Sequence, residues 1–157
     1  MKISLLVIGK TDSKHLSAMT ADYAKRLGFY VPFSLEIIAD IKNAKHLSED
    51  QQKQAEGELI LKRIQSSDTL VLLDEKGKTL SSIGFSEFLQ KKMNSGLKQL
   101  IFVIGGPYGF SEAIYQRANG KLSLSAMTFS HQMIRLFFVE QLYRAFTILK
   151  NEPYHHQ

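Results

Sequence analysis

Three short segments of the chain carry residue types from which a ligand site can be built. They are the strand end Leu72-Leu73-Asp74, the glycine loop at residues 105–109 and the run at residues 124–129. Each stands at the carboxyl end of a predicted strand. Ligands of open α/β sheets bind at that edge, where loops provide backbone N–H groups and room for a substrate, so the three segments together predict one site.

The glycine loop, Gly105-Gly106-Pro107-Tyr108-Gly109, does not match the common nucleotide-binding motifs. The G-x-G-x-x-G spacing is absent, and no P-loop lysine followed by serine or threonine is present. The proline also removes a backbone donor where a phosphate cradle needs one. A strand-to-helix turn that needs positive φ angles would explain the glycines without any ligand. The two other segments at the same edge favour a binding role.

Residues 124–129 offer backbone donors and apolar side chains but few ionisable groups. They are Leu124, Ser125, Ala126, Met127, Thr128 and Phe129. Such a lining suits an adenine ring, which needs a flat apolar slot and a few amide hydrogen bonds. The alternative is a semi-buried connection in which Met127 and Phe129 fill the core.

Titratable residues near the end of the chain supply further chemistry. His131 and Arg135 are four residues apart and share one face of a predicted helix, although a histidine at a helix start is more often a capping or surface residue. The tail Tyr154-His155-His156 is aromatic and titratable, but chain ends are usually solvated. The chain has no cysteine, and only the adjacent tail histidines come near a metal-binding spacing, so we predict no metal site.

Alternating apolar runs and helical periodicities predict the elements that position these residues. We expect strands at residues 1–9, 33–38, 69–74, 100–104 and 121–125, and helices at residues 13–28, 48–66, 82–96, 111–118 and 130–150. Residues 75–78 are expected to form a turn, and residues 39–47 a mobile loop. This order predicts an α/β fold, a mainly parallel sheet with helices on both faces.

Composition limits the function classes. The 157 residues are enough for a single domain spanning 1–157, with 44% hydrophobic residues and no run of membrane-spanning length. No signal peptide is recognisable, so a cytoplasmic protein is the default. Residues 1–75 carry ten Lys and Arg against eleven Asp and Glu, whereas residues 76–157 carry ten against four. This surplus predicts a polyanionic partner such as RNA, or serves solubility alone.

Taken together, the motifs resemble the ribosomal RNA large-subunit methyltransferase H family, of the SPOUT class of RNA methyltransferases. The resemblance covers essentially the whole chain. It rests on Ile104-Gly105-Gly106-Pro107-Tyr108-Gly109, on residues 122–131, and on Glu140-Gln141-Leu142-Tyr143-Arg144-Ala145 with Asn151-Glu152-Pro153-Tyr154-His155. Ser130 replaces a proline that relatives often show, and His156 fills the family's final basic position.

The resemblance implies a C-terminal trefoil knot, which ordinary rules of chain topology would exclude. It implies that S-adenosylmethionine is held by Leu73, Gly105 and residues 124–129. It also implies a homodimer, with the apolar stripe of the last helix as a reasonable interface and the active site shared between subunits. The implied substrate is pseudouridine 1915 of 23S rRNA, methylated at N3 within the ribosome, with no DNA or membrane partner.

Three residues are candidates for the transfer step in such an enzyme. The N3–H of the base is a weak acid, so a nearby base, or a cation that stabilises the anion, lowers the barrier. We expect His155 to act as the general base or to position the target base, and Tyr154 to stack on the uracil ring or orient it. We expect Arg135, permanently charged, to stabilise the anion or grip phosphate.

Two other functions remain open from the residues alone. One is a non-catalytic RNA-binding or ribosome-assembly protein that uses the same basic half. The other is a small nucleotide-binding enzyme of ordinary doubly wound topology. Binding of S-adenosylmethionine, of RNA alone, or of ATP or NAD separates the three.

Overall fold

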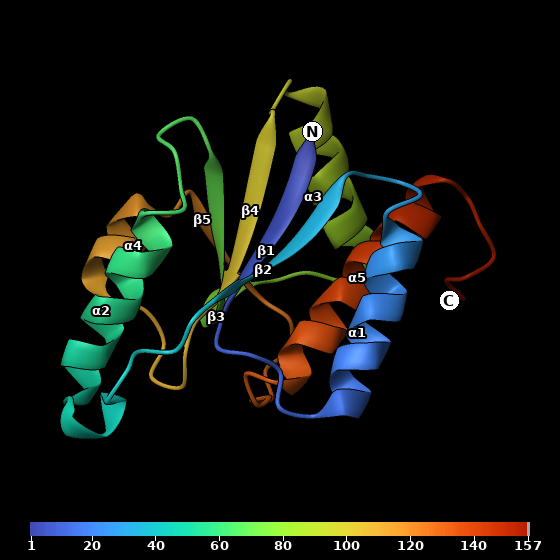
Figure 1. Ribbon diagram of the computed structural model, residues 1–157. Coiled ribbons are helices and arrows are strands. Elements are labelled where there is room, and N and C mark those ends of the chain that lie inside the picture. The colour runs from blue at the N-terminus through green and yellow to red at the C-terminus, as the bar shows by residue number, and fades with distance from the viewer. Residues whose placement is uncertain (157) are drawn as a thin grey trace.

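A computed structural model describes residues 1–156 and shows a five-stranded parallel sheet between two layers of helices (Figure 1). The strand order is β2-β1-β4-β3-β5, and every strand pair is parallel. The predicted mainly parallel sheet with helices on both faces is therefore confirmed. Strand order does not test the trefoil knot, which stays a prediction. Along the chain the elements are β1 (Lys2–Ile8), α1 (Lys14–Leu27), β2 (Phe33–Ile38), η1 (Ala44–His46), α2 (Glu49–Leu61), β3 (Thr69–Thr79), α3 (Ser82–Asn94), β4 (Gln99–Ile104), α4 (Glu112–Arg117), β5 (Gly120–Ser123) and α5 (Met133–Leu149).

Each face of the sheet has its own apolar core, because successive side chains of a strand point to opposite faces. Leu5 and Val7 of β1 belong to the cluster that α1, α3 and α5 cover. Leu6 and Ile8 belong to the cluster that α2 and α4 cover. Figure 1 shows these two groups of helices on opposite sides of the strands. Burial on both faces explains why the central strands are nearly unbroken apolar runs in the sequence.

The three predicted site segments leave the sheet from neighbouring strands at one edge. Leu73 of β3 pairs with Ile104 of β4 on one side and with Leu122 of β5 on the other. The glycine loop begins directly after Ile104, and the 124–129 segment begins two residues after Leu122. Parallel pairing therefore brings the segments together, as the sequence predicted.

β3 is longer than predicted. The expected turn at residues 75–78 is wrong, because the strand continues to Thr79 and pairs with β5 across a register shift between Leu73 and Lys78. Gly77 permits this path, since a Cβ there would lie 2.5–2.7 Å from the backbone of Leu122. The charged residues and the glycine at positions 75–78 have the composition of a turn, which explains the wrong prediction. The irregularity moves Asp74 and its neighbours to the rim of the site.

Helix ends differ from the expected ones by a few residues. Ser81, not Ser82, caps α3, with its Oγ accepting from the amide of Gly84 at 3.1 Å. The Ser48–Gln51 capping box of α2 is present, but the helix ends at Leu61 and not near residue 66.

α5 begins at Met133, whose amide donates to Ser130 Oγ at 3.1 Å, so Ser130 lies ahead of the helix and accepts from it.

Within residues 1–156, none of the helices is long and apolar enough to span a membrane.

The apolar stripe of α5 serves mainly the core. Phe138, Leu142 and Ala145 are buried against the sheet with α1 and α3. The large apolar side chains of the helix that stay exposed are Met133 and Phe137, in its first two turns. An interface on this helix would therefore lie near its start, beside the 124–129 segment.

Candidate functional site

A cavity of about 540 Å³ lies at the carboxyl edge of the sheet, between the ends of β3, β4 and β5 and the start of α5. Its size is that of an ordinary small-molecule site. All of the residues predicted to bind a cofactor, except Ala126, line this cavity: Leu73, Gly105, Leu124, Ser125, Met127, Thr128 and Phe129. The sequence therefore located the segments correctly, while the ligand they bind stays a prediction.

The glycine loop is a tight turn closed by its own backbone. The amide of Gly109 donates to the carbonyl of Gly106 at 3.2 Å, and Gly109 has φ +82°, which favours glycine. A Cβ on Gly105 would lie 3.1 Å from the carbonyl oxygen of Gly109 and from the ring of Phe110. The glycines thus serve the turn, and they also keep one wall of the cavity free of side chains.

Serine side chains shape the wall formed by residues 123–130. Ser123 Oγ donates to the carbonyl of Ser125 at 2.9 Å, and Ser125 Oγ accepts from the amide of Met127 at 2.9 Å. Met127 and Phe129 are 77% and 40% exposed, so they do not fill the core as the alternative interpretation required. The wall is a local structure that leaves apolar side chains open to a ligand or to another chain.

A carboxylate stands at the rim of the cavity. Asp74 accepts from the hydroxyl of Tyr115 at 2.5 Å and from the amide of Lys76 at 2.8 Å. Burial raises the pKa of Tyr115, and the hydrogen bond to Asp74 raises it further. The hydroxyl of Tyr115 therefore stays protonated and donates a hydrogen bond to Asp74. This bond fixes the carboxylate of Asp74 at the cavity.

Arg135 is deeply buried, with 1% of its surface exposed. Its guanidinium donates to the backbone carbonyls of Ile8 at 2.5 Å and Gly9 at 2.9 Å, and its Nε donates to the carbonyl of His131 at 3.0 Å. Burial lowers its pKa, against the opposing effect of Asp40 and Asp12. This position favours a structural role, joining the end of β1 to the start of α5, over the direct contact with substrate that the sequence suggested.

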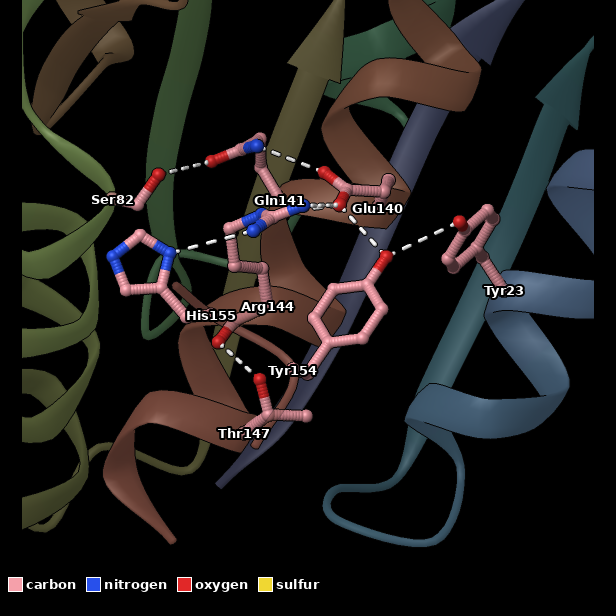
Figure 2. A network of polar contacts seen from close by, with 8 residues as sticks. All are labelled: Tyr23, Ser82, Glu140, Gln141, Arg144, Thr147, Tyr154 and His155. Carbon is pink, nitrogen blue, oxygen red and sulfur yellow. Dashed lines mark hydrogen bonds and ion pairs between the residues drawn. The ribbon is translucent and has the colours of Figure 1, made fainter. Parts of the chain in front are cut away.

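The other two predicted catalytic residues, Tyr154 and His155, fold back against α5 (Figure 2). Tyr154 Oη donates to Glu140 Oε1 at 2.9 Å and lies 3.2 Å from the hydroxyl of Tyr23. The guanidinium of Arg144 lies 4.8 Å from the centre of the Tyr154 ring, and its Nη1 lies 3.4 Å from His155 Nδ1. Burial raises the pKa of Tyr154, as do its two hydrogen bonds. The tail is thus held in place by partners on α1 and α5.

The tail and the cavity do not meet within one chain. Neither Tyr154 nor His155 is among the residues that line the cavity. The cavity lies at the start of α5, whereas the tail follows the other end of this 17-residue helix, about 25 Å of helix away. Figure 1 shows the C-terminus beyond α1, on the side of the sheet opposite to α2 and α4. Residues that the sequence placed in one active site thus occupy two separate places.

A family model described as "Predicted SPOUT methyltransferase" matches residues 1–155. The chain is 70% identical to a protein of Flavobacterium johnsoniae and 69% identical to one of Flavobacterium psychrophilum, with all of each chain covered. Both carry the name ribosomal RNA large subunit methyltransferase H. The chain belongs to the SPOUT methyltransferase family. A solved structure of a probable methylase family protein from Haemophilus influenzae aligns with a TM-score of 0.46 at 16% identity, over 99% of this chain and 70% of that one.

For a SPOUT methyltransferase, the charge surplus of residues 76–157 is distributed unexpectedly. Arg135 is buried and Arg144 pairs with Glu140 at 2.5 Å. Lys91 and Lys92 lie in the last turn of α3, ahead of the amino end of β4 and therefore away from the cavity edge. These four cations are not among the residues that line the cavity, whereas Lys76 is. Net charge by half of the chain therefore does not by itself locate the RNA-binding surface.

The sequence did not indicate the surroundings of two residues, Tyr115 in the cavity lining and Glu56 behind the glycine loop. Tyr115 lines the cavity and fixes Asp74, but its only signal in the sequence was its place in a short helix after the glycine loop. Glu56 is buried against Gly106, although it belongs to a long helix that is rich in charged residues. No periodicity distinguished it from Glu58, its exposed neighbour.

Proposed function

We propose that this chain is an S-adenosylmethionine-dependent methyltransferase of ribosomal RNA, which methylates N3 of a pseudouridine in 23S rRNA. The observation that supports this most is the cavity of about 540 Å³ at the edge of the sheet, on which Leu73, Gly105 and the 124–129 segment converge. The name carried by the curated relatives supports the substrate class. The bacterial cytoplasm, where ribosomes work, is the proposed location.

The residues of the cavity fit a methyl donor of this kind. Met127 and Phe129 offer apolar surface for an adenine ring, and Gly105 leaves space for a ligand beside the backbone. Asp74, fixed by Tyr115, offers a carboxylate to hydroxyl or ammonium groups. When bound, S-adenosylmethionine supplies a methyl group activated by its sulfonium sulfur.

The proton on N3 of the target base has to leave for methylation to occur, and His155 is the proposed base or base-positioning residue. Arg144 lies 3.4 Å from this histidine and is permanently charged, so it is suited to stabilise the anion that forms on the uracil ring. We assign this role to Arg144 and not to Arg135, because the guanidinium of Arg135 already donates to buried backbone carbonyls. Tyr154, whose pKa is raised, keeps its proton and orients the ring.

A second copy of the chain is proposed to complete the site. The tail does not reach the cavity of its own chain, so the cavity of one copy would receive the tail of the other. The exposed apolar side chains Met133 and Phe137 lie at the start of α5, beside the exposed Phe129 of the cavity wall. These residues are the proposed interface of a homodimer.

The function is tested by calorimetry with S-adenosylmethionine and by mass spectrometry of 23S rRNA from cells with and without this protein. We expect micromolar binding of S-adenosylmethionine, and loss of one methyl group from a pseudouridine when the protein is absent. Binding to ribosomes without methyl transfer would favour a non-catalytic RNA-binding protein. Binding of ATP or NAD in place of S-adenosylmethionine would favour a nucleotide-binding enzyme of another class.

A further inference from the structure

The buried carboxylate of Glu56 in α2 has no part in the function described so far. Only 3% of its surface is exposed, and none of the ion pairs in residues 1–156 includes it. A carboxylate that is removed from water without a cationic partner destabilises a fold unless hydrogen bonds compensate. Its position therefore needs a physical explanation.

The carboxylate of Glu56 lies directly behind the glycine loop. A Cβ on Gly106 would lie 2.7 Å from Glu56 Oε1 and still closer to Oε2, so a side chain there would force the Glu56 carboxylate to move. The carboxylate packs against the backbone of Gly106, and Gln52 Nε2 donates to its Oε1 at 2.8 Å. Glu56 thus contacts the backbone at the first turn of the loop that forms the cavity wall.

The next residue of α2 contacts the other end of the same loop. A Cβ on Gly57 would collide with Ser111 Oγ and would lie 3.3 Å from Ile114. Ser111 is the N-cap of α4, the helix into which the loop runs. Two consecutive residues of one helix therefore pack against the two ends of this segment, Glu56 at Gly106 and Gly57 at Ser111, just after the loop. Any shift of α2 or loss of Glu56 would release the wall of the cavity.

We infer that Glu56 is a positioning residue for the cofactor, because it holds Gly106 and so keeps the glycine loop in the conformation that lines the cavity. The inference rests on the proposed function, since it takes the ligand of the cavity to be S-adenosylmethionine. Glu56 acts through the loop and does not contact the ligand. α2 is then part of the binding machinery, although it contributes no residue to the cavity lining.

The test compares Glu56→Ala with Glu56→Gln and with Glu58→Gln. Glu58 is exposed on the same helix and serves as the matched control. We expect Glu56→Ala to weaken S-adenosylmethionine binding about tenfold, the size expected for loss of one hydrogen bond to a charged group. Glu56→Gln keeps the volume that packs against Gly106 and an acceptor for Gln52, and it should stay within about threefold of the parent. In steady-state kinetics the KM for S-adenosylmethionine should rise while the KM for ribosomes stays constant.

A second comparison separates positioning from general loss of structure. Gly106→Ala should weaken binding because its Cβ meets the Glu56 carboxylate. Glu56→Ala removes that obstacle, so the double variant should bind S-adenosylmethionine more tightly than Gly106→Ala alone. Binding by Glu56→Ala equal to that of the parent, or a double variant as weak as the product of the two single effects, would overturn the inference.

A third measurement does not depend on any ligand. Hydrogen exchange at the Gly106 amide should be faster in Glu56→Ala than in the parent and in Glu58→Gln, while the amides of β1 keep their protection. If the parent itself binds no S-adenosylmethionine, the proposed function fails, yet this exchange experiment still decides whether Glu56 holds the loop. Equal exchange in all three proteins would overturn the inference.

Discussion

The hydroxyl of Tyr115 donates to Oδ2 of Asp74 at 2.5 Å and ties α4 to the irregular part of β3. Both residues line the cavity. α4 follows β4 and the glycine loop, whereas Asp74 belongs to β3, 41 residues earlier in the chain, so this contact fixes the two sides of the cavity relative to each other. The carboxylate is therefore held ready before a ligand arrives, which lowers the cost of ordering it on binding.

Tyr115→Phe removes this hydrogen bond and little else. We expect the free energy of unfolding to fall by about 1–2 kcal/mol, as for loss of a hydrogen bond to a charged group. S-adenosylmethionine should also bind several-fold more weakly, because the released carboxylate is free to turn away. Chemical denaturation and calorimetry measure the two effects. Tyr108→Phe is the control, since Tyr108 lies at the same cavity with 46% of its surface exposed. Equal behaviour of the two variants would argue against the role of Tyr115.

Arg135→Met tests whether the buried arginine is structural. The variant leaves the carbonyls of Ile8 and Gly9 without their donor, and we expect unfolding to become easier by about 3 kcal/mol or more. Arg135→Lys should recover part of the lost stability, because the lysine ammonium can reach only some of these carbonyls. Activity should follow the folded fraction in thermal unfolding and transfer assays. A folded Arg135→Met protein with normal stability and no methyl transfer would restore the catalytic role suggested by the sequence.

Burial of Glu56 makes stability depend on pH. Burial raises the pKa of Glu56 above its ordinary value of 4.5, with Asp40 acting in the same direction, while the hydrogen bond from Gln52, the backbone of Gly106 and the charge of His131 oppose the rise. The native state therefore binds this proton more readily than the unfolded state does. The contribution of Glu56 to the free energy of unfolding falls as pH rises from 4.5 through the folded pKa, and it is constant above that.

Glu56→Gln removes this titration. Relative to the parent, the free energy of unfolding of the variant should rise between pH 4.5 and the folded pKa of Glu56 and then level off. Urea denaturation of both proteins from pH 4 to pH 8 measures the difference. Glu58→Gln, at an exposed position, should show no such trend. A difference that is independent of pH across this range would show that Glu56 titrates normally.

The location of the site could be predicted from the sequence, because it depends on a local rule. Parallel strands align their carboxyl ends, so Leu73, Gly105 and Leu124 had to come close once their strands were recognised. The error at residues 75–78 has a local cause as well. Glu75, Lys76 and Gly77 have the composition of a turn, but they lie in β3 between two segments of the strand that both pair with β5.

The roles of individual side chains could not be predicted, because they depend on partners far away in the chain. Helical spacing showed that Arg135 shares a face with His131, but not that its guanidinium binds carbonyls of β1, 126 and 127 positions away. Likewise, nothing near Glu56 in the sequence indicates Gly106 as its neighbour. Helix α5 separates Tyr154 from the cavity within one chain, so their joint action stays a prediction that requires an active site shared between subunits.

Phe137→Glu tests the proposed interface. Phe137 is 38% exposed and lies against Phe129, with ring centres 5.0 Å apart. A glutamate there would place a charge in the apolar contact between two copies, so we expect a dimer of the parent to become a monomer in light-scattering measurements. Phe29→Glu is the control, because Phe29 is 83% exposed and lies between α1 and β2. If Phe137→Glu keeps the mass of the parent, the interface lies elsewhere.

Two inactive variants, combined in one dimer, test whether the tail works on the cavity of the other copy. Gly105→Val fills the cavity wall and His155→Ala removes the proposed base, so each variant alone should transfer methyl groups at least about a hundredfold more slowly.

A mixed dimer, purified through two different affinity tags, combines the intact cavity of the His155→Ala copy with the intact tail of the Gly105→Val copy. If the site is shared, the mixed dimer has one complete site and should show about half of the parental activity. If each tail serves its own chain, the mixed dimer has no complete site and stays inactive. Circular dichroism of both single variants excludes unfolding as the cause of their inactivity.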